Sequence, residues 1–215
     1  MIDASSKNKK VEVGILGLQG DIEEHFSSVD LALSKSGSDG EAVLVKSSDD
    51  VKKIHALIIP GGESTVMGSL SSIKGMLPVL RQRIGSESLP TLGTCAGMIM
   101  LAKKCFDRVV GETNQLLIGT LDIAVERNSF GRQRESFETQ FDLDMVGGKN
   151  FHGVFIRAPS VKSVGDGVRV LATLEDSIMV AVQQGSTIAT AFHPELSGST
   201  LLHEYLISLA MGAAR

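Results

Sequence analysis

The fold is decided by the stretch Pro90-Thr-Leu-Gly-Thr-Cys-Ala-Gly-Met-Ile-Met-Leu-Ala-Lys-Lys104. Residues 89–92 are short and apolar, which predicts a buried strand, whereas residues 98–104 are good helix formers. Between these elements lies Gly93-x-Cys95-x-Gly97, where the flanking glycines remove the Cβ atoms that would clash in a sharp turn. The pattern is typical of a nucleophile elbow that carries cysteine in place of serine.

The elbow predicts a reactive position for Cys95. Its sulfur would project above the sheet edge, at a helix N-terminus whose partial positive charge favours an anionic sulfur. The backbone N–H of Ala96 would point toward the same position and could hold a developing oxyanion. The alternative interpretation is a buried structural thiol in a tight turn, and only a partner elsewhere in the chain can separate the two.

The end of the chain supplies such a partner. In Ala191-Phe-His193-Pro-Glu195, the histidine follows an apolar strand and falls at a loop edge, with Glu195 two residues beyond it. A histidine can take the proton of a cysteine, and a carboxylate can orient that histidine. We therefore predict a catalytic triad of Cys95, His193 and Glu195.

A second loop is predicted to face the same crevice. The apolar run 55–60 ends in Pro60-Gly61-Gly62-Glu63-Ser64-Thr65, where the two glycines free the backbone to turn its N–H groups outward. Ser64 is expected to cap the helix that begins near Thr65. Ligands of parallel sheets bind beyond the carboxyl ends of the strands, so this loop and the elbow should lie together.

The remaining pattern predicts an α/β fold. Strands at 11–18 and 42–46, with a helix from a capping Asp21 through about residue 34, favour a parallel sheet. We expect a three-layer α/β sandwich in which helices flank a mainly parallel central sheet, with a small antiparallel extension. Further expected elements are helices at 47–50, 75–84 and 198–211, and strands at 118–126, 137–144, 151–156, 168–174, 178–184 and 187–192.

Other reactive residue types are interpreted as structural. Cys105 is expected to be an ordinary thiol at the end of the elbow helix, and His25 and His203 to be structural or solvated. The five histidines and two cysteines show no spacing typical of metal ligands, so we expect no metal and no cofactor on this chain. The polar loop 126–134 carries three arginines and could bind a carboxylate.

The composition limits the class of protein. A chain of 215 residues that is 42% hydrophobic and 21% charged fits a single domain, expected at residues 11–215 after a flexible tail at 1–10. A net charge of −4 and only 4% aromatic residues argue against a nucleic-acid or anionic-membrane partner. Two cysteines and no apolar run of membrane-spanning length favour a cytoplasmic location.

The order of motifs carries a resemblance. A Pro-Gly-Gly loop, then Gly-x-Cys-x-Gly, then His-x-Glu resembles the class I (triad) glutamine amidotransferases. Within them the chain is similar to the glutaminase subunits of pyridoxal 5′-phosphate synthases, from Val11 to the last helix. The stretch Gly14-Ile-Leu-Gly-Leu-Gln-Gly20 matches the same pattern, and the narrower resemblance rests on Glu126-Arg-Asn-Ser-Phe-Gly-Arg-Gln133 and Val154-Phe-Ile-Arg-Ala-Pro159.

The resemblance implies hydrolysis of L-glutamine to L-glutamate and ammonia, with delivery of the ammonia to a partner synthase subunit that makes pyridoxal phosphate. It implies an oxyanion hole formed by the backbone N–H groups of Gly62 and Ala96. It also implies a hetero-oligomer, and low activity of this chain alone. The residues that it assigns to glutamine binding are Gly62, Glu63, Ser64, Arg127, Ile156 and Arg157.

Other functions remain open at the level of sequence. The glutaminase of a different ammonia-channelling synthase, such as one that forms an imidazole ring, would show the same elbow and His-x-Glu. A catalytically silent subunit that only binds a partner is disfavoured because all three triad residue types are present. An esterase or peptidase built on the elbow is disfavoured as well, although fold alone does not exclude it.

Overall fold

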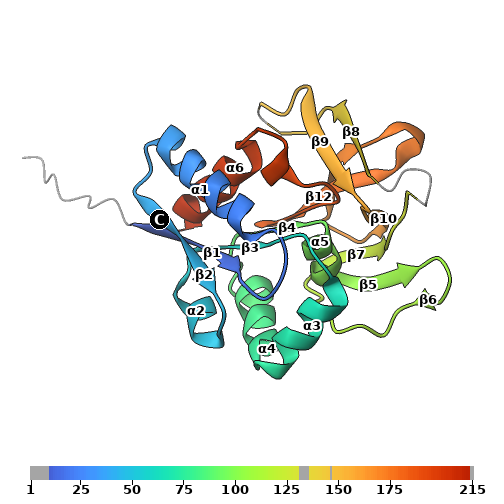
Figure 1. The fold of residues 1–215 in the computed structure, drawn as a ribbon, viewed down its shortest axis with the longest axis horizontal. Helices are drawn as coiled ribbons and strands as arrows, with labels where there is room; N and C mark the ends of the chain where they lie inside the picture. Colours follow the sequence, from blue (N-terminus) through green and yellow to red (C-terminus); the bar gives the residue numbers. More distant parts are fainter. Residues whose placement is uncertain (1–9, 131–135, 146, 214–215) are drawn as a thin grey trace, which may run out of the picture.

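The structure is a computed structural model that describes residues 10–130, 136–145 and 147–213. The predicted tail at 1–10 therefore lies outside the described residues, except for Lys10. A twisted central sheet runs across the molecule, and helices cover both of its faces (Figure 1). In the described part of the chain this sheet contains 11 strands, and a second sheet contains two.

Half of the large sheet is parallel and holds the core. The register aligns Val13 with Ala42 on one side and with Ala56 on the other, and Thr91 with Leu57 and Thr187. All residues of the three central strands are buried, which explains their continuous apolar sequence. The order is β2 (Gly40–Val45), β1 (Val11–Leu16), β3 (Ala56–Ile59), β4 (Thr91–Thr94) and β13 (Thr187–Thr190).

The other half is mostly antiparallel and continues from β13. Its strands follow in the order β12 (Met179–Gln184), β10 (Ser160–Val164), β7 (Leu121–Glu126), β5 (Ala102–Asp107) and β6 (Gly111–Glu112), with β11 (Arg169–Thr173) paired to β12. Only the β5–β7 pair in this half is parallel among the described strands. The separate ribbon consists of β8 (Ser136–Phe141) and β9 (Phe151–Ile156). The predicted fold class, including its antiparallel extension, is confirmed.

Two groups of helices cover the sheet (Figure 1). Helices α1 (Ile22–Ser36) and α6 (Leu201–Ala213) pack together on one face. The other face carries α2 (Ser48–Lys53), α3 (Ser64–Ile73) and α4 (Met76–Arg81), which a π-helical turn at Gln82–Ser86 extends. Ser47 and Asp50 form a capping box that starts α2, as the polar run at 47–50 predicts.

An aromatic cluster fastens the β8–β9 ribbon to the sheet. The rings of Phe137 and Phe155 are stacked with their centroids 4.6 Å apart, and Phe155 lies 5.6 Å from Phe192. Phe192 directly precedes His193, and the His193 backbone N–H donates a 2.8 Å hydrogen bond to the Val154 carbonyl of β9. The ribbon thus holds the loop after β13 in place.

Two of the differences from the predicted elements lie next to Cys95 and to the glycine loop. Helix α5 spans only Ala96–Leu101, and the chain continues at once as strand β5. Cys105 therefore lies buried on a strand rather than at a helix end, because Ala102–Asp107 pairs with β7. At α3 the N-cap is Glu63, whose carboxylate accepts from the Thr65 N–H at 3.2 Å. Ser64 is instead the first helical residue, and its hydroxyl contacts Gln115.

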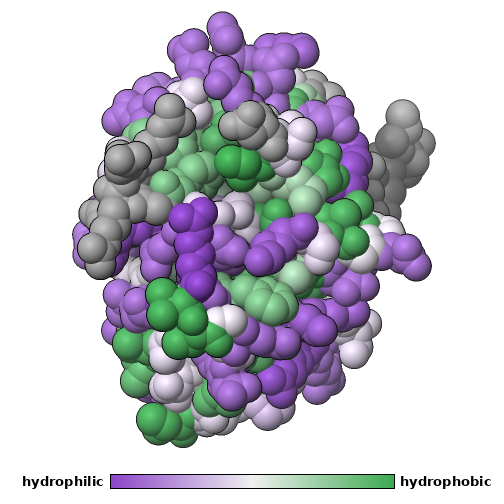
Figure 2. All heavy atoms as spheres, turned by 90° about the vertical axis from the view of Figure 1, so that its right-hand side faces the viewer, coloured by the Kyte–Doolittle hydropathy of each residue, from purple (hydrophilic) through white to green (hydrophobic). Residues whose placement is uncertain are grey.

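The surface carries both hydrophilic and hydrophobic residues. The face that carries β5 and β6 shows hydrophilic residues interspersed with smaller hydrophobic groups (Figure 2). Among the described residues, no helix is both long enough and apolar enough to cross a membrane. Apolar side chains are gathered mainly in the interior, where strands β1, β3 and β4 meet the helices.

Candidate active site

Cys95 sits at a strained turn between β4 and α5. Its backbone adopts φ 48° and ψ −101°, a region that L-residues other than glycine rarely occupy. A Cβ atom on Gly97 would collide with the Ile59 carbonyl oxygen, and one on Gly93 would lie 2.7 Å from the Gly97 carbonyl oxygen. Only glycine at both positions lets α5 start this close to the sheet. The Gly93-x-Cys95-x-Gly97 pattern therefore has a direct steric cause.

His193 meets Cys95 in one cavity. Both residues line it, although Cys95 is only 8% exposed and His193 only 3%. The thiol donates a 3.8 Å hydrogen bond to the Ile156 carbonyl and makes no hydrogen bond to the His193 ring. His193 Nε2 is buried and has no hydrogen-bond partner among the described residues. The cysteine and the histidine thus border one cavity, and Nε2 is free to take a proton there.

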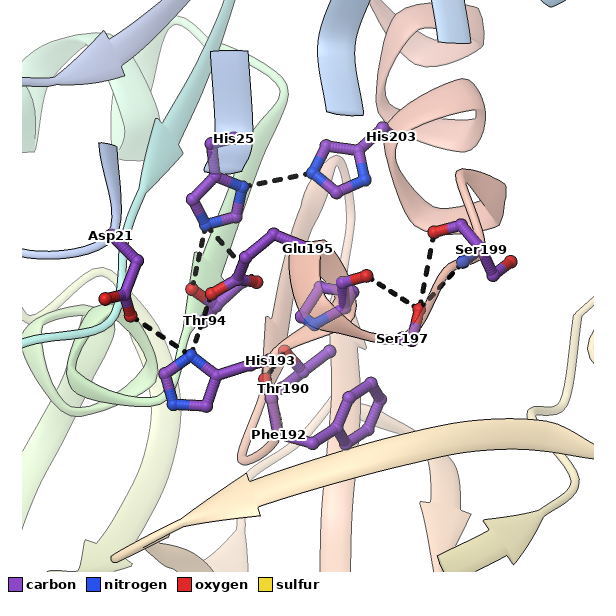
Figure 3. A network of polar contacts seen from close by, with 11 residues as sticks. Asp21, His25, Thr94, Thr190, Phe192, His193, Glu195, Ser197, Ser199 and His203 are labelled. Atoms are coloured by element: carbon purple, nitrogen blue, oxygen red, sulfur yellow. Dashed lines mark hydrogen bonds and ion pairs between the residues drawn. The ribbon is translucent and has the colours of Figure 1, made fainter. Parts of the chain in front are cut away.

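Glu195 lies behind His193 and completes the group of three. Its Oε1 is 2.7 Å from His193 Nδ1, and its side chain is fully buried (Figure 3). Pro194 begins the 3-10 turn Pro194–Leu196, which brings the two side chains together. The structure thus brings together the three residues proposed as a triad, and leaves Nε2 of His193 on the side of the cysteine.

Burial and charge compete in setting the protonation of His193. Burial lowers the pKa of its ring, but interactions with Asp21, Cys95 and Glu195 outweigh that effect and raise the pKa to about 12. The pKa of the Glu195 carboxyl is raised, because burial outweighs its contact with the His193 ring. At neutral pH these interactions favour the protonated ring, and the Cys95 thiol can supply its proton.

Asp21 is a site residue that the sequence analysis missed. It was predicted to cap α1, yet its side chain makes no capping hydrogen bond within the described residues, although it occupies the N-cap position. Its Oδ2 lies 3.2 Å from His193 Nδ1 instead (Figure 3). The prediction was wrong because a contact 172 residues along the chain (193 − 21) overrides the local preference for a helix cap.

The cavity has a volume of about 330 Å³, and the elbow, the glycine loop and the β9 end surround it. Gln19 also lines it, and its side-chain oxygen accepts a 2.6 Å hydrogen bond from the Glu63 backbone N–H. Neither Gln19 nor Ile99 nor Asn128 was predicted, since none belongs to a reactive residue type. All six residues predicted to bind glutamine line the cavity: Gly62, Glu63, Ser64, Arg127, Ile156 and Arg157.

Two arginines at the cavity can recognise an anion. Arg127 Nη2 lies 3.5 Å from Glu63 Oε1, so its guanidinium is only loosely engaged. Arg157 adopts φ 44° at the end of β9 and is exposed. A guanidinium matches the geometry of a carboxylate, which makes both residues candidates for binding a substrate carboxylate. Arg132 and Arg134 of the predicted carboxylate-binding loop lie outside the described residues.

The glycine loop approaches the cavity in a conformation that only glycine adopts easily. Gly62 has φ 148°, and a Cβ atom there would lie 3.0 Å from Gln19 Cδ. The Gly61 carbonyl accepts a 3.3 Å hydrogen bond from the Asp21 backbone N–H. Gly62 and Ala96 both border the space beside Cys95, where two backbone N–H groups could hold an oxyanion.

A buried histidine pair extends the polar network behind the cavity (Figure 3). His25 lies 3.4 Å from Glu195 and 3.0 Å from His203, and both histidines are fully buried. Their burial agrees with the predicted structural role. The contact between His25 and Glu195 was not predicted. Asp21, His193 and Glu195 also bring three possible metal-ligand atoms within 4.8 Å, but these atoms already contact one another.

Comparison with known proteins identifies the family. The model of the SNO glutamine amidotransferase family matches residues 15–211. The protein named pyridoxal 5′-phosphate synthase subunit PdxT from Nitrosopumilus maritimus is 46% identical over 92% of this chain and 96% of its own length. Its namesake from Pyrobaculum neutrophilum is 47% identical over 93% of this chain and 99% of its own.

Solved structures agree with this relationship. A crystal structure described as a glutamine amidotransferase superposes with a TM-score of 0.78 at 45% identity, and covers 92% of this chain and 98% of that one. A glutamine amidotransferase from Thermotoga maritima shares the fold with a TM-score of 0.58 at 13% identity. It covers 92% of this chain and 81% of that one. The chain belongs to the SNO glutamine amidotransferase family.

Proposed function

We propose that this chain is the glutaminase subunit of a pyridoxal 5′-phosphate synthase. It hydrolyses L-glutamine to L-glutamate and ammonia, and supplies the ammonia for vitamin B6 synthesis. The single observation that carries the assignment is the 46% identity to a subunit of such a synthase over 92% of the chain. The cavity beside Cys95, which a thiol, a histidine ring and two arginines border, has the groups that this reaction needs.

The first half of the reaction forms a thioester. Cys95 Sγ attacks the side-chain amide carbon of glutamine after its proton has passed to His193 Nε2. The carbonyl oxygen becomes an oxyanion, which accepts hydrogen bonds from the backbone N–H groups of Gly62 and Ala96. Loss of one such donor costs on the order of 3 kcal/mol in the barrier. His193 then donates its proton to the departing nitrogen, and ammonia leaves.

The second half hydrolyses the thioester. His193, now neutral, takes a proton from water while the water oxygen attacks the thioester carbon. A second oxyanion forms in the same position, its collapse releases L-glutamate from Cys95, and His193 returns its proton to the sulfur to regenerate the thiol. Glu195 holds the His193 ring through Nδ1, at 2.7 Å, so that Nε2 faces the sulfur in both halves.

Glutamine is held by its amino-acid end. We propose that Arg127, Arg157 or both pair with the α-carboxylate, since each guanidinium borders the cavity. Glu63 carries the opposite charge at the same cavity and is suited to the α-ammonium group. Gly62, Ser64 and Ile156 complete the proposed binding site. A cytoplasmic location is consistent with the reduced thiol that the mechanism requires.

The partner is the synthase subunit that consumes the ammonia. Unregulated hydrolysis would waste glutamine, so we propose that this chain alone is weakly active and that docking near the elbow activates it. The Gly61–Gly62 loop is a suitable hinge, because glycine changes φ at little cost. Equal glutamate release with and without the synthase subunit would contradict this regulation.

A reconstituted assay tests the function. The chain is mixed with its cognate synthase subunit, glutamine, a pentose phosphate and a triose phosphate, and both glutamate and pyridoxal phosphate are measured. We expect both products, and we expect an ammonium salt to replace glutamine when Cys95→Ala is used. Glutamate without pyridoxal phosphate would indicate a different ammonia-using synthase. Absence of glutamate would indicate a silent binding subunit.

A further inference from the structure

We infer that Asp21 is a second carboxylate partner of His193, a positioning residue that holds the imidazolium in place beside Cys95. This inference rests on the proposed function and adds a residue outside the Cys95, His193 and Glu195 triad. Asp21 does not touch the reacting atoms of Cys95 in the described structure, and acts only through the far nitrogen of the histidine ring.

The geometry places two carboxylates on one nitrogen. Nδ1 of His193 lies 2.7 Å from Glu195 Oε1 and 3.2 Å from Asp21 Oδ2. The Glu195 side chain is fully buried, whereas that of Asp21 is 41% exposed at the edge of the cavity. One N–H cannot donate a full hydrogen bond to both oxygens, so the second carboxylate contributes mainly through its charge.

The backbone leaves room for this contact at Gly61. A Cβ atom at that position would lie 2.7 Å from Asp21 Oδ2 and 3.0 Å from His193 Nδ1, and would collide with His193 Cε1. The Asp21 backbone N–H is fixed by a 3.3 Å hydrogen bond to the Gly61 carbonyl. The glycine loop therefore ties the start of α1 to the loop after β13, which lets the two side chains meet.

Asp21 forgoes a local interaction to make this contact. An aspartate at an N-cap normally accepts a hydrogen bond from the backbone of the first helical turn, which stabilises the helix. Within the described residues the Asp21 side chain makes no such bond. Its contact with His193 lowers the pKa of the Asp21 carboxyl against the opposing effect of burial, so the group is anionic at neutral pH.

The negative charge of Asp21 adds to that of Glu195 in stabilising the protonated His193 ring. With Glu195 alone, one buried anion would balance the imidazolium, while burial would disfavour its charge. Asp21 favours transfer of the Cys95 proton to His193 and so increases the fraction of thiolate. The titratable and charged groups that face His193 or border its cavity are Asp21, His25, Glu63, Cys95, Arg127, Arg157 and Glu195.

Alkylation of Cys95 by iodoacetamide measures that fraction without glutamine or the synthase. The rate is followed from pH 5 to 9 in the wild type and in Asp21→Asn, with Cys95→Ser giving the background from the buried Cys105. A carboxylate at this distance raises the pKa of a histidine ring such as that of His193 by roughly 1 to 3 units. Because the Asp21 side chain is partly exposed, we expect a shift near the lower limit. We expect the Asp21→Asn rate at pH 7 to fall about tenfold.

The controls separate charge from folding. Asparagine caps helices as well as aspartate does, so the melting temperature of Asp21→Asn should match that of the wild type. Asp21→Ser, another good cap without charge, should show the same loss of alkylation rate. Glu23→Gln removes one negative charge from the exposed first turn of α1 and should leave the rate unchanged.

Three results would overturn the inference: alkylation of Asp21→Asn within twofold of the wild type at every pH, recovery of the wild-type rate in Asp21→Ser, or an equal loss in Glu23→Gln. In the reconstituted assay, Asp21→Asn should lower kcat more than it changes KM. If Asp21→Asn slows alkylation but the wild type with its synthase subunit forms no glutamate, the proposed function is contradicted and the role of Asp21 stands.

Discussion

His25 Nε2 lies 3.4 Å from Glu195 Oε2, and neither side chain is exposed to solvent. On its other side, His25 Nδ1 is 3.0 Å from His203 Nε2 (Figure 3). His203 Nδ1 has no hydrogen-bond partner among the described residues. A buried N–H group without an acceptor is rarer than a buried acceptor atom without a donor, so Nδ1 is the unprotonated nitrogen. The proton of His203 therefore sits on Nε2, so His25 accepts at Nδ1 and donates its Nε2–H to Thr94, with Glu195 Oε2 close by.

Replacing His25 tests whether this contact supports the proposed triad. His25→Leu keeps a comparable volume but removes the polar ring nitrogen beside Glu195 Oε2, whereas His25→Gln keeps a donor group. Polar contacts to charged groups contribute up to about 1.5–3 kcal/mol, so we expect kcat for glutamine hydrolysis to fall about tenfold in the leucine variant. The glutamine variant should recover most of that loss. Equal kcat values for both folded variants would contradict the role.

His203 makes stability depend on pH. Burial lowers the pKa of its ring to about 4, below the ordinary value of 6.5. The unfolded chain therefore binds a proton at a higher pH than the folded chain, and stability is lost as the pH falls from 6.5 toward 4. This group alone should reduce the free energy of unfolding by about 2 kcal/mol between pH 7 and pH 5.

Urea unfolding of the wild type and of His203→Asn at these two pH values checks the effect. Asparagine does not titrate, so the variant should lose less stability than the wild type on acidification, even if it is less stable at pH 7. The same loss in both proteins would mean that other groups cause the acid sensitivity.

Gly97 is predicted to be essential for the elbow. A Cβ atom there would collide with the Ile59 carbonyl oxygen of the neighbouring strand, so Gly97→Ala must push α5 away from the sheet. Overpacking of this kind costs about 1–3 kcal/mol, and it would also displace Cys95. Gly212→Ala is a matched control in α6, because a Cβ atom there meets nothing within 4 Å. Thermal unfolding should show a lower melting temperature for Gly97→Ala and no decrease for Gly212→Ala.

Local sequence patterns predicted those elements whose conformation depends on nearby residues. The elbow at Cys95 and the buried strands could be found because glycine spacing and apolar runs reflect sterics and burial within a few residues. The strand Ala102–Asp107 was missed because Lys103 and Lys104 favour a helix, while pairing with β7 decides their conformation. Its neighbour β6 and strand β10 (Ser160–Val164) were missed as well, since each is short and is defined by its partners.

Contacts between distant segments could not be predicted in the same way. Asp21 has the sequence context of a helix cap, and nothing near it indicates a histidine far along the chain. The position of His25 behind Glu195 likewise depends on how α1 and α6 pack on the sheet. Gln19 entered the site through its hydrogen bond to the Glu63 backbone, a role that its residue type does not reveal.

The proposed chemistry of Cys95 can be measured most directly by trapping the thioester. The chain is mixed with glutamine and the synthase subunit, quenched in acid within one turnover, and digested for mass spectrometry. We expect a γ-glutamyl group on the peptide that contains Cys95 in the wild type, and neither adduct nor glutamate with Cys95→Ala. Glutamate release by Cys95→Ala at the wild-type rate would contradict the assignment of Cys95 as the nucleophile.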